Sequence, residues 1–375
     1  MLSPTTEKDL QDAIASAKGP LRVMGGGTRP IGKPLAGEVL SVAEMSGITL
    51  YEPGSLTIVA QAGTPLAEIE AALAADNQRL PFEPMDHRKL LGSDGAPTIG
   101  GVVASNASGP RRIQVGAARD SLIGVRFVDG QGTAVKNGGR VMKNVTGYDL
   151  VKLMAGSWGT LGVLSEVSFK VLPDVESRAC VMLDGLGDAQ AVEAMCLALA
   201  SPFEVTGAAH LPKGPEGQPV TLLRLEGFAE SVAYRTAQLC ALLDRFGQTR
   251  VETEAEQVKS IWYAIRDVED FADRAGDVWR ISVKPTDGPE IAARIGGEVI
   301  YDWGGGLIWA LAPEGADVRA KLGTFAGHAT LIRASEDTRA NMPVFQPEPA
   351  PLAKLTQGLR AKFDPRGILN PGLMG

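Results

Sequence analysis

The chain has 375 residues, of which 44% are hydrophobic and 22% charged, and its formal net charge at pH 7 is −7. This length and composition indicate a folded protein of two domains rather than a disordered chain. Lysines and arginines are spread along the sequence without the basic stripe that nucleic-acid binding requires, so we expect no nucleic-acid partner. We also expect no transmembrane segment and no signal peptide, since no apolar run is long enough and residues 1–8 lack the signal pattern.

Cysteines and histidines are few, and their spacing excludes several kinds of site. The residues are Cys180, Cys196, Cys240, His87, His210 and His328. The cysteines lie too far apart for a Cys-x-x-Cys or iron–sulfur motif and predict a reducing, cytoplasmic location. No pair of histidines has the spacing of metal ligands, so we predict no metal site and expect surface or hydrogen-bonded histidines.

The N-terminal part predicts a mixed pattern of helices and strands. An amphipathic helix follows residues 3–6, with Thr5 or Thr6 as its N-cap. Short strands are expected at residues 21–24, 39–42, 48–51 and 57–61. A second helix then begins, with Thr64 as N-cap and Pro65 at the first helical position. This order is not a strict alternation of parallel strands and helices.

The next part predicts antiparallel strands and then a domain boundary. Residues 123–128 and 132–136 form a hairpin around Asp129 and Gly130. A long apolar strand is expected at residues 161–171, and a boundary between domains at residues 173–176.

The middle section alternates strands and helices in another order. Strands are expected at residues 180–183, 205–211, 221–225, 279–283, 298–301, 307–311 and 329–332. Helices are expected at residues 189–200, 230–246, 256–271, 289–295 and 316–325. This order predicts one large antiparallel sheet backed by helices, a ferredoxin-like arrangement that is either single or doubled. A Pro-rich extended segment at residues 343–351 and a helix at residues 352–363 complete the prediction.

Four segments could carry chemistry. The glycine run at residues 25–27 follows a strand, where successive backbone N–H groups can face one anion such as a pyrophosphate; alternatively it is an ordinary tight turn. Residues 95–112 have almost no side-chain bulk, which suits a chain lying against a flat cofactor; alternatively they are a glycine-rich loop packed on the core. Residues 143–150 with 156–164, and the tail at residues 363–372, are the other two.

Together these segments resemble a known family. Residues 24–28, 98–101, 159–163, 363–365 and 369–372 come in the order found in FAD-binding oxidoreductases of the vanillyl-alcohol-oxidase type. Residues 106–112, 143–149 and 344–347 look like the FAD-binding E-type subunits of bacterial glycolate oxidases rather than their larger partner. The resemblance spans almost the whole chain.

The resemblance implies an α+β fold in three parts. These are a two-subdomain PCMH-type FAD-binding domain (residues 1–174), a ferredoxin-like antiparallel-sheet cap (175–335) and a C-terminal strip that returns to the FAD domain (336–375). The cap agrees with the order of elements read above from the sequence alone.

The resemblance also implies a cofactor and its binding residues. The flavin is expected to be non-covalent FAD, because the first loop has Thr28 and no nearby histidine. A side chain at Gly26 or Gly101 is expected to occupy cofactor volume. The implied FAD-binding residues are Gly25, Gly26, Gly27, Thr28, Arg29, Pro97, Thr98, Gly100, Gly101, Ser105, Asn106, Ser108, Gly159, Gly162, Val163 and Asn370.

The implied chemistry is oxidation of a small 2-hydroxy acid such as glycolate, with a base for the hydroxyl proton and a cation for the carboxylate. Catalytic relatives carry paired histidines and an acidic residue that hold a metal ion, whereas His210 and His328 each stand alone here. The sequence therefore assigns no catalytic residue. Arg111, Arg112, Arg280 and Lys284 are either anion holders or members of surface salt bridges.

Two readings of the function remain open at this stage. In one, this subunit oxidises the 2-hydroxy acid itself; in the other, it carries a flavin for structure or electron relay while a homologous partner performs catalysis. A nucleotide-binding reductase would need an NAD(P)-type glycine pattern, which the sequence lacks. The resemblance implies two partners, a larger homologous flavoprotein subunit and an iron–sulfur subunit, and a cytoplasmic complex, either free or peripheral to the inner membrane.

Overall fold

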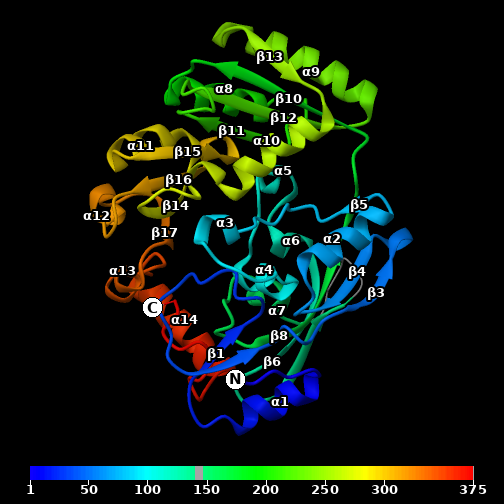
Figure 1. The fold of residues 1–375 in the computed structure, drawn as a ribbon, viewed down its shortest axis with the longest axis vertical. Helices are drawn as coiled ribbons and strands as arrows, with labels where there is room; N and C mark the ends of the chain where they lie inside the picture. The colour runs from blue at the N-terminus through cyan, green and yellow to red at the C-terminus, as the bar shows by residue number, and fades with distance from the viewer. Residues whose placement is uncertain (140–146, 375) are drawn as a thin grey trace. The chain divides into compact units, whose positions relative to one another are not determined.

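A computed structural model describes residues 1–139 and 147–374. The chain divides into two compact units (Figure 1). Unit 1 comprises Met1–Ser108, Gly116–Asp174 and Pro347–Gly375, and unit 2 comprises Gly109–Val115 and Val175–Gln346. Gly109–Val115 therefore belongs with unit 2, and the chain returns to unit 1 at Pro347. The assignment of these parts as FAD domain, cap and strip stays a prediction.

Unit 1 is built on a five-stranded antiparallel sheet in the order β3-β4-β8-β6-β7. The strands are β3 (Ile48–Glu52), β4 (Thr57–Gln61), β8 (Val163–Lys170), β6 (Leu122–Val128) and β7 (Ala134–Gly138). The predicted hairpin at Asp129 is confirmed: its carboxylate oxygen Oδ1 accepts from the backbone N–H of Gln131 at 2.8 Å and of Thr133 at 2.9 Å. Such a side chain fixes a turn by replacing backbone acceptors.

Helices cover one core of this unit. They are α2 (Leu66–Ala75), α4 (Ile99–Ser105), α6 (Ala118–Ser121) and α7 (Leu150–Met154), with α3 (Arg88–Leu91) in a neighbouring loop. Their apolar side chains join those of the sheet in one buried cluster that includes Val102, Phe127 and Phe169. Residues 66, 69 and 73 of α2 are buried, as its spacing predicted. Pro65 precedes the helix instead of occupying its first position.

A second core of unit 1 joins both ends of the chain. Helix α1 (Glu7–Ser16) and the parallel strands β1 (Leu21–Met24) and β2 (Glu38–Ser41) surround Leu10, Ile14 and Leu369. Thr6 caps α1, because its hydroxyl accepts from the backbone N–H of Asp9 at 3.1 Å. The backbone N–H of Leu21 donates to the carbonyl of Ile368 at 2.7 Å, so the C-terminal tail lies along β1. Helix α14 (Ala350–Phe363) precedes this tail, and a short pair β5 (Gln78–Arg79) and β9 (Leu172–Pro173) lies elsewhere in the unit.

Unit 2 contains an eight-stranded antiparallel sheet backed by helices, which confirms the α+β fold class (Figure 1). The strand order is β13-β10-β12-β11-β15-β16-β14-β17. The strands are β10 (Ser177–Asp184), β11 (Gly207–Leu211), β12 (Val220–Gly227), β13 (Thr249–Glu252), β14 (Asp277–Val283), β15 (Glu298–Asp302), β16 (Leu307–Ala312) and β17 (Gly327–Arg333). The helices are α5 (Arg112–Val115), α8 (Asp188–Leu199), α9 (Ala229–Leu243), α10 (Ala255–Asp267), α11 (Gly288–Ile295), α12 (Val318–Leu322) and α13 (Glu336–Asn341).

The chain order of these elements shows a doubled ferredoxin-like unit. The first half runs β10-α8-β11-β12-α9-β13 and the second β14-α11-β15-β16-α12-β17, so each is a strand–helix–strand–strand–helix–strand repeat. Strand β13 was missed in the sequence prediction, since Val251 is the one apolar residue of Thr249–Glu252 and none of its residues is buried. The two halves meet where β11 pairs with β15, through His210 and Tyr301.

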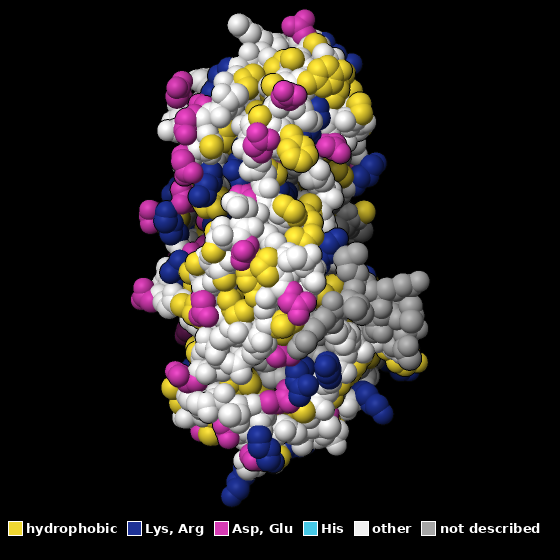
Figure 2. Space-filling model, turned by 90° about the vertical axis from the view of Figure 1, so that its right-hand side faces the viewer, with side chains coloured by type: hydrophobic (Ala, Val, Ile, Leu, Met, Phe, Trp, Pro, Cys, Tyr) yellow, Lys and Arg dark blue, Asp and Glu magenta, His cyan; other side chains and the backbone are white. Residues whose placement is uncertain are grey.

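The surface has a mixed character on the face drawn in Figure 2, where basic and acidic side chains are interspersed. Exposed large hydrophobic side chains of the described residues include Phe228 and Tyr234 on unit 2 and Leu355 on α14. Within residues 1–139 and 147–374, no helix combines the length and apolar character needed to cross a bilayer.

A buried polar group stands at the junction between the two halves of the large sheet. His210 is fully buried, and its ring atom Nδ1 lies 2.9 Å from the hydroxyl of Thr221. The hydroxyl of Tyr301 donates to Asp188 Oδ2 at 2.6 Å, and His210 Nε2 lies 3.5 Å from Asp188 Oδ1. His210 and, more weakly, Tyr301 stabilise the carboxylate and hold the pKa of Asp188 below its ordinary value, against the opposing effect of burial.

The substitution Asp188→Asn tests this junction. We expect it to lower the free energy of unfolding by about 1 kcal/mol at pH 7, because it weakens the charge-assisted contacts of the carboxylate with Tyr301 and His210. The loss is no larger because solvent partly screens the charge of Asp188. A carboxylate whose pKa is depressed by folding contributes stability above its ordinary pKa, and that contribution is lost as the pH falls through the folded value. Thermal unfolding measured from pH 7 to pH 3 should therefore show the two proteins converging at the acid end.

Asp184→Asn is the matched control, because Asp184 pairs with Arg250 on the exposed surface of the same sheet. It should change the unfolding temperature little at any pH. Equal unfolding temperatures for Asp188→Asn and the unsubstituted protein at pH 7 would contradict the role given to the junction.

Candidate functional site

The loop after β1 contains a row of backbone donors without protein acceptors in the described part of the chain. Gly25, Gly26 and Gly27 continue from Met24, and Gly27 has φ +71°, a conformation that favours glycine. Among the described residues, no protein oxygen accepts a hydrogen bond from the backbone N–H of Gly26, Gly27 or Thr28. Successive N–H groups without protein acceptors form a concave site suited to an anion. The loop thus has the donors that a phosphate group would need, and binding of the cofactor there stays a prediction.

A second glycine-rich loop lies directly against the first. A Cβ at Gly26 would stand 1.7 Å from the carbonyl oxygen of Ala96, and a Cβ at Gly25 would stand 2.4 Å from the Thr98 hydroxyl. A Cβ at Gly95, whose φ is +103°, would stand 2.4 Å from the carbonyl oxygen of Gly26. The sequence analysis explained the glycine at position 26 by the volume of the cofactor. The structure adds a second reason, because the backbone of Ala96 lies too close to Gly26 for any side chain, with or without a cofactor.

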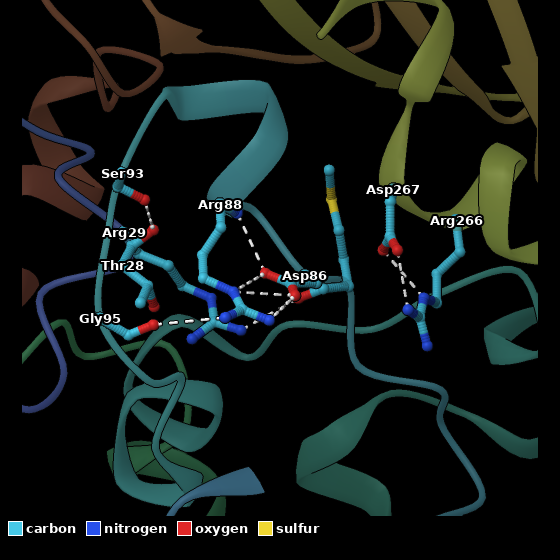
Figure 3. Close-up of polar contacts among 9 residues, drawn as sticks. Thr28, Arg29, Asp86, Arg88, Ser93, Gly95, Arg266 and Asp267 are labelled. Atoms are coloured by element: carbon cyan, nitrogen blue, oxygen red, sulfur yellow. Dashed lines mark hydrogen bonds and ion pairs between the residues drawn. The ribbon is translucent and has the colours of Figure 1, made fainter. Parts of the chain in front are cut away.

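A third loop, at residues 85–95, supports the first and was missed by the sequence reading (Figure 3). Arg29 donates from Nε to His87 Nδ1 at 3.1 Å and from Nη2 to the Met85 carbonyl at 3.0 Å. Ser93 donates to the carbonyl of Thr28 at 3.0 Å. The Arg29 side chain therefore fastens this loop beside the glycine run.

Two charged side chains brace the same loop. Asp86 forms an ion pair with Arg88 at 2.7 Å, and Arg88 Nη1 lies 3.4 Å from the carbonyl of Gly95 (Figure 3). The charged run at residues 86–89 was the signal in the sequence that could have pointed to this role.

The segment at residues 97–105 is mostly helix α4 rather than a thin extended chain. The hydroxyl of Thr98 caps the helix by accepting from the backbone N–H of Gly101 at 3.3 Å, and Pro97 is buried, its carbonyl accepting from Leu66 at 2.7 Å. A Cβ at Gly100 would stand 2.7 Å from Ala62, so this glycine lets α4 pack closely on the sheet. A Cβ at Gly101 would approach the Thr98 hydroxyl at 3.3 Å and Arg29 Nη1 at 3.5 Å, which leaves room for a small side chain.

The polar residues at the end of α4 bind the protein itself. Ser105 donates to the carbonyl of Gly101 at 2.7 Å. Asn106 ends the helix with φ +50°, and its side-chain oxygen accepts from the backbone N–H of Arg119 at 3.1 Å. Ser108 accepts from the backbone N–H of Ala118 at 2.9 Å. These contacts order the helix end, so a cofactor role for the three side chains stays a prediction.

Asn370 joins the first segment to the later ones. Its side-chain oxygen accepts from the backbone N–H of Val23 at 2.7 Å, and its Nδ2 donates to the carbonyl of Trp158 at 2.8 Å. A Cβ at Gly159, whose φ is +71°, would stand 3.0 Å from Asn370 Nδ2. The backbone N–H of Trp158 in turn donates to the carbonyl of Ala104 in α4 at 2.9 Å. The structure thus brings together segments that the sequence predicted to converge.

Two predicted residues lie away from this group. A Cβ at Gly162 would stand 2.6 Å from the Phe127 ring, and Val163 is buried in the core around Leu10. Both positions have packing contacts that account for their residue types. The predicted family segment at residues 143–149 lies largely outside the described residues.

Unit 2 contains a cluster of cations on and near Gly109–Val115. Arg111 is buried, and its guanidinium forms a two-bond ion pair with Glu226, one bond of 2.8 Å from Nε to Oε2. Arg178 and Arg224 lie 3.6 Å from the same carboxylate. Because this carboxylate holds Arg111, that arginine fixes the segment in unit 2 and is not a free anion holder.

Arg112 and Arg280 both lie over the indole ring of Trp303. The guanidinium carbons are 4.6 Å and 5.0 Å from the ring centroid, and Arg280 is also 6.0 Å from the ring of Trp309. Among the residues that the structure describes, no carboxylate lies within ion-pair distance of Arg280. Burial, and then the charge of Arg112, lower the pKa of Arg280 to about 10, so the guanidinium remains a cation at neutral pH.

His328 belongs to the same face of the sheet. In the strand register Arg280 stands opposite Thr330 and Ser282 opposite His328, which places the four side chains on one face. Burial and the charges of Arg280 and Arg112 lower the pKa of His328, so it is neutral at pH 7. Arg112 and Arg280 therefore form a positively charged pair beside a neutral imidazole, an arrangement that can bind a small anion.

The remaining candidates of the sequence reading do not join this cluster. Lys284 is exposed just before Pro285, and His210 is buried at the sheet junction described above. Within the described part of the chain, no group of three or more His, Cys, Asp or Glu side chains could hold a metal ion.

The N-terminal part of the chain matches a family of cofactor-binding domains. Residues 1–138 match the family described as an FAD binding domain. The fold resembles solved structures of alkyldihydroxyacetonephosphate synthase, one of them with a TM-score of 0.71 over 98% of this chain and 76% of that one. Only 16% of the aligned residues are identical, so this likeness concerns the fold alone.

Curated relatives are closer in sequence. Glycolate oxidase subunit GlcD of Bacillus subtilis (strain 168) is 30% identical over 239 residues, which cover 63% of this chain and 47% of that protein. Glycolate oxidase subunit GlcE of Escherichia coli (strain K12) is 34% identical over 362 residues, which cover 96% of this chain and 93% of that protein. From this identity over nearly the full length of both proteins, the chain belongs to the family of glycolate oxidase subunit GlcE.

Proposed function

We propose that this chain is the FAD-binding subunit of a glycolate oxidase complex, which converts glycolate to glyoxylate. The observation that carries the proposal is the row of backbone N–H groups at Gly26, Gly27 and Thr28 without protein acceptors, in a domain of the FAD-binding family. Bound FAD supplies the acceptor for the hydride that leaves C2 of the 2-hydroxy acid. The names of the relatives GlcE and GlcD support glycolate as the substrate.

The FAD pyrophosphate would lie on the loop at residues 25–29, where backbone N–H groups have no protein acceptor among the described residues and Arg29 holds the supporting loop. Thr98, Gly100 and Gly101 at the start of α4 and Asn370 beside β1 would complete the site. The fit supports a non-covalent flavin, since His87, the one histidine of unit 1, is buried and accepts from Arg29 through Nδ1.

The substrate carboxylate would be held by Arg112 and Arg280 of unit 2. Two guanidiniums beside one indole ring present the planar N–H donors that recognise carboxylates. The like charges of Arg112 and Arg280, reflected in the lowered pKa of Arg280, favour the arrival of an anion. The base that takes the hydroxyl proton is not assigned.

The complex would include a larger homologous flavoprotein subunit of the GlcD type and an iron–sulfur subunit. The subunit names of the two relatives support a multi-subunit assembly. In the cell the complex would be cytoplasmic, either free or peripheral to the inner membrane.

The first test concerns the flavin. The purified chain should be yellow with the absorption of bound FAD, and Gly26→Ala should lower the flavin content about tenfold or more, since overpacking two backbones costs about 1–3 kcal/mol. Gly358→Ala is the control, because a Cβ there meets no described atom within 4 Å. A colourless chain that takes up no added FAD would refute the cofactor assignment.

Gly101→Val separates cofactor space from protein packing. A Cβ at this position meets only ordinary or slightly tight contacts, so we expect the unfolding temperature of the apoprotein to change by no more than about 3 °C. The flavin content should nevertheless fall, because the added methyl groups would occupy the cofactor's volume. Unchanged flavin content would place the cofactor away from α4.

The second test concerns the substrate. In the assembled complex Arg280→Gln should raise the KM for glycolate about 10- to 100-fold, the effect of losing a charge-assisted hydrogen bond of about 1.5–3 kcal/mol. Arg250→Gln removes a cation from the exposed surface of β13 and should leave KM unchanged. If KM stays the same in Arg280→Gln, the carboxylate is bound elsewhere. If flavin in this chain is reduced only when the partner is present, the chain acts as an electron relay.

A further inference from the structure

Trp303 adopts a backbone conformation that is unusual for its residue type. It starts the 3-10 turn η5 (Trp303–Gly305) between β15 and β16, with φ +54°. Non-glycine residues in this region are strained, and such residues gather at functional sites. The strain is held by Asp302, whose Oδ1 accepts from the backbone N–H of Trp303 at 2.6 Å.

The indole of Trp303 is fixed at both ends. Its Nε1–H donates to the carbonyl of Gly109 at 3.1 Å, and the side chain is only 8% exposed. The turn that carries it packs closely on α8, because a Cβ at Gly304 would stand 2.5 Å from Leu199 and one at Gly305 would stand 2.9 Å from Val192. The hydrogen bond and this packing hold the ring beside Arg112, three residues beyond Gly109.

The ring compensates for the repulsion between two guanidiniums. Arg112 and Arg280 carry the same charge in a partly desolvated place, so each disfavours the other. An aromatic face attracts a cation through its quadrupole, and an indole does so more strongly than a phenyl ring. With guanidinium carbons 4.6 Å and 5.0 Å from its centroid, the indole of Trp303 attracts both cations at once.

We propose that Trp303 is a positioning residue, whose indole holds Arg112 and Arg280 together as a two-guanidinium site for a small carboxylate. The inference rests on the proposed function of this cluster as the substrate-anion site. Trp303 acts through the arginines and does not itself contact the carboxylate. Its removal lets the like charges separate, which weakens the site without removing either cation.

Three substitutions of the full chain test this role. Trp303→Phe keeps an aromatic face but loses the N–H donated to Gly109, Trp303→Leu loses both, and Trp303→Gln loses the ring but keeps an N–H donor. Oxalate is the probe, a small carboxylate with no hydride to lose, and its affinity is measured by titration calorimetry. We expect Trp303→Phe to stay within about threefold of the unsubstituted chain and the other two to lose about tenfold or more.

Several measurements distinguish positioning of the two arginines by Trp303 from a general contribution of Trp303 to the stability of the fold. Trp303→Phe and Trp303→Leu both lose the hydrogen bond to Gly109, so a purely structural role would weaken oxalate binding equally in both. In the complex, Trp303→Leu or Trp303→Gln should raise the KM for glycolate more than it lowers kcat. The loss caused by Trp303→Gln should also disappear in an Arg112→Gln background, where no second cation needs holding.

The possible results are distinct. Equal oxalate affinity across the Phe, Leu and Gln variants would overturn the role of Trp303 and leave the proposed function intact. If the unsubstituted chain binds neither oxalate nor glycolate while it retains FAD, the anion site itself fails, and the inference with it. If Trp303→Leu does not fold, the oxalate affinities of Trp303→Gln and Trp303→Phe still compare a side chain without an aromatic ring with one that has it.

Discussion

The side-chain amide of Asn370 joins parts of unit 1 that are hundreds of residues apart in the sequence. Its oxygen accepts from β1 next to the glycine loop, and its nitrogen donates to the turn that caps the end of α4. A primary amide suits this place because it offers a donor and an acceptor at once, and both partners are backbone groups that need one. The glycine loop, α4 and the turn at Trp158 keep their relative positions because this amide connects them.

The two candidate sites use opposite physical solutions. In unit 1 the anion-binding groups are backbone N–H donors, which carry no charge and cost little to keep dehydrated. In unit 2 they are guanidiniums, and each cation must be compensated: Arg111 by the carboxylate of Glu226, Arg112 and Arg280 by an aromatic face. The first arrangement suits a permanently bound phosphate group. The second suits a ligand that comes and goes, since an anion would add to the stabilisation that the aromatic face gives the two cations.

Much of this architecture could be predicted from the sequence. The order of elements at residues 177–333 identifies the large antiparallel sheet, because alternating apolar positions and turn residues are local signals. The four glycine-rich and C-terminal segments indicated the family, and the first of them indicated the loop that follows β1. Helix α4 was missed, since its run of Gly, Ala, Val and Ser has weak helix propensity, and the helix depends on the Thr98 cap and on packing against Ala62.

Other features were invisible because they arise from contacts between distant residues. Nothing near Arg29 in the sequence indicates that it fastens a loop almost 60 positions later. Trp303 follows Asp302 in the connection between β15 and β16, and nothing in the neighbouring sequence marks it as special. Its proposed role depends on contacts with Arg112 and Arg280, which are distant in the sequence. A side chain at position 26 was predicted to enter the volume of the cofactor, and the structure adds that it would also collide with the carbonyl oxygen of Ala96.

The placement of the last residues has a consequence for how the protein is made. Each half of the large sheet uses one continuous stretch of chain, so unit 2 can form as it leaves the ribosome. Unit 1 is completed later, because Leu369 lies in the core with α1 and β1, and the Asn370 side chain accepts from the backbone N–H of Val23. The N-terminal elements can therefore gain the support of residues 85–98 early in synthesis, whereas the contacts with Leu369 and Asn370 form only after those two residues have been made.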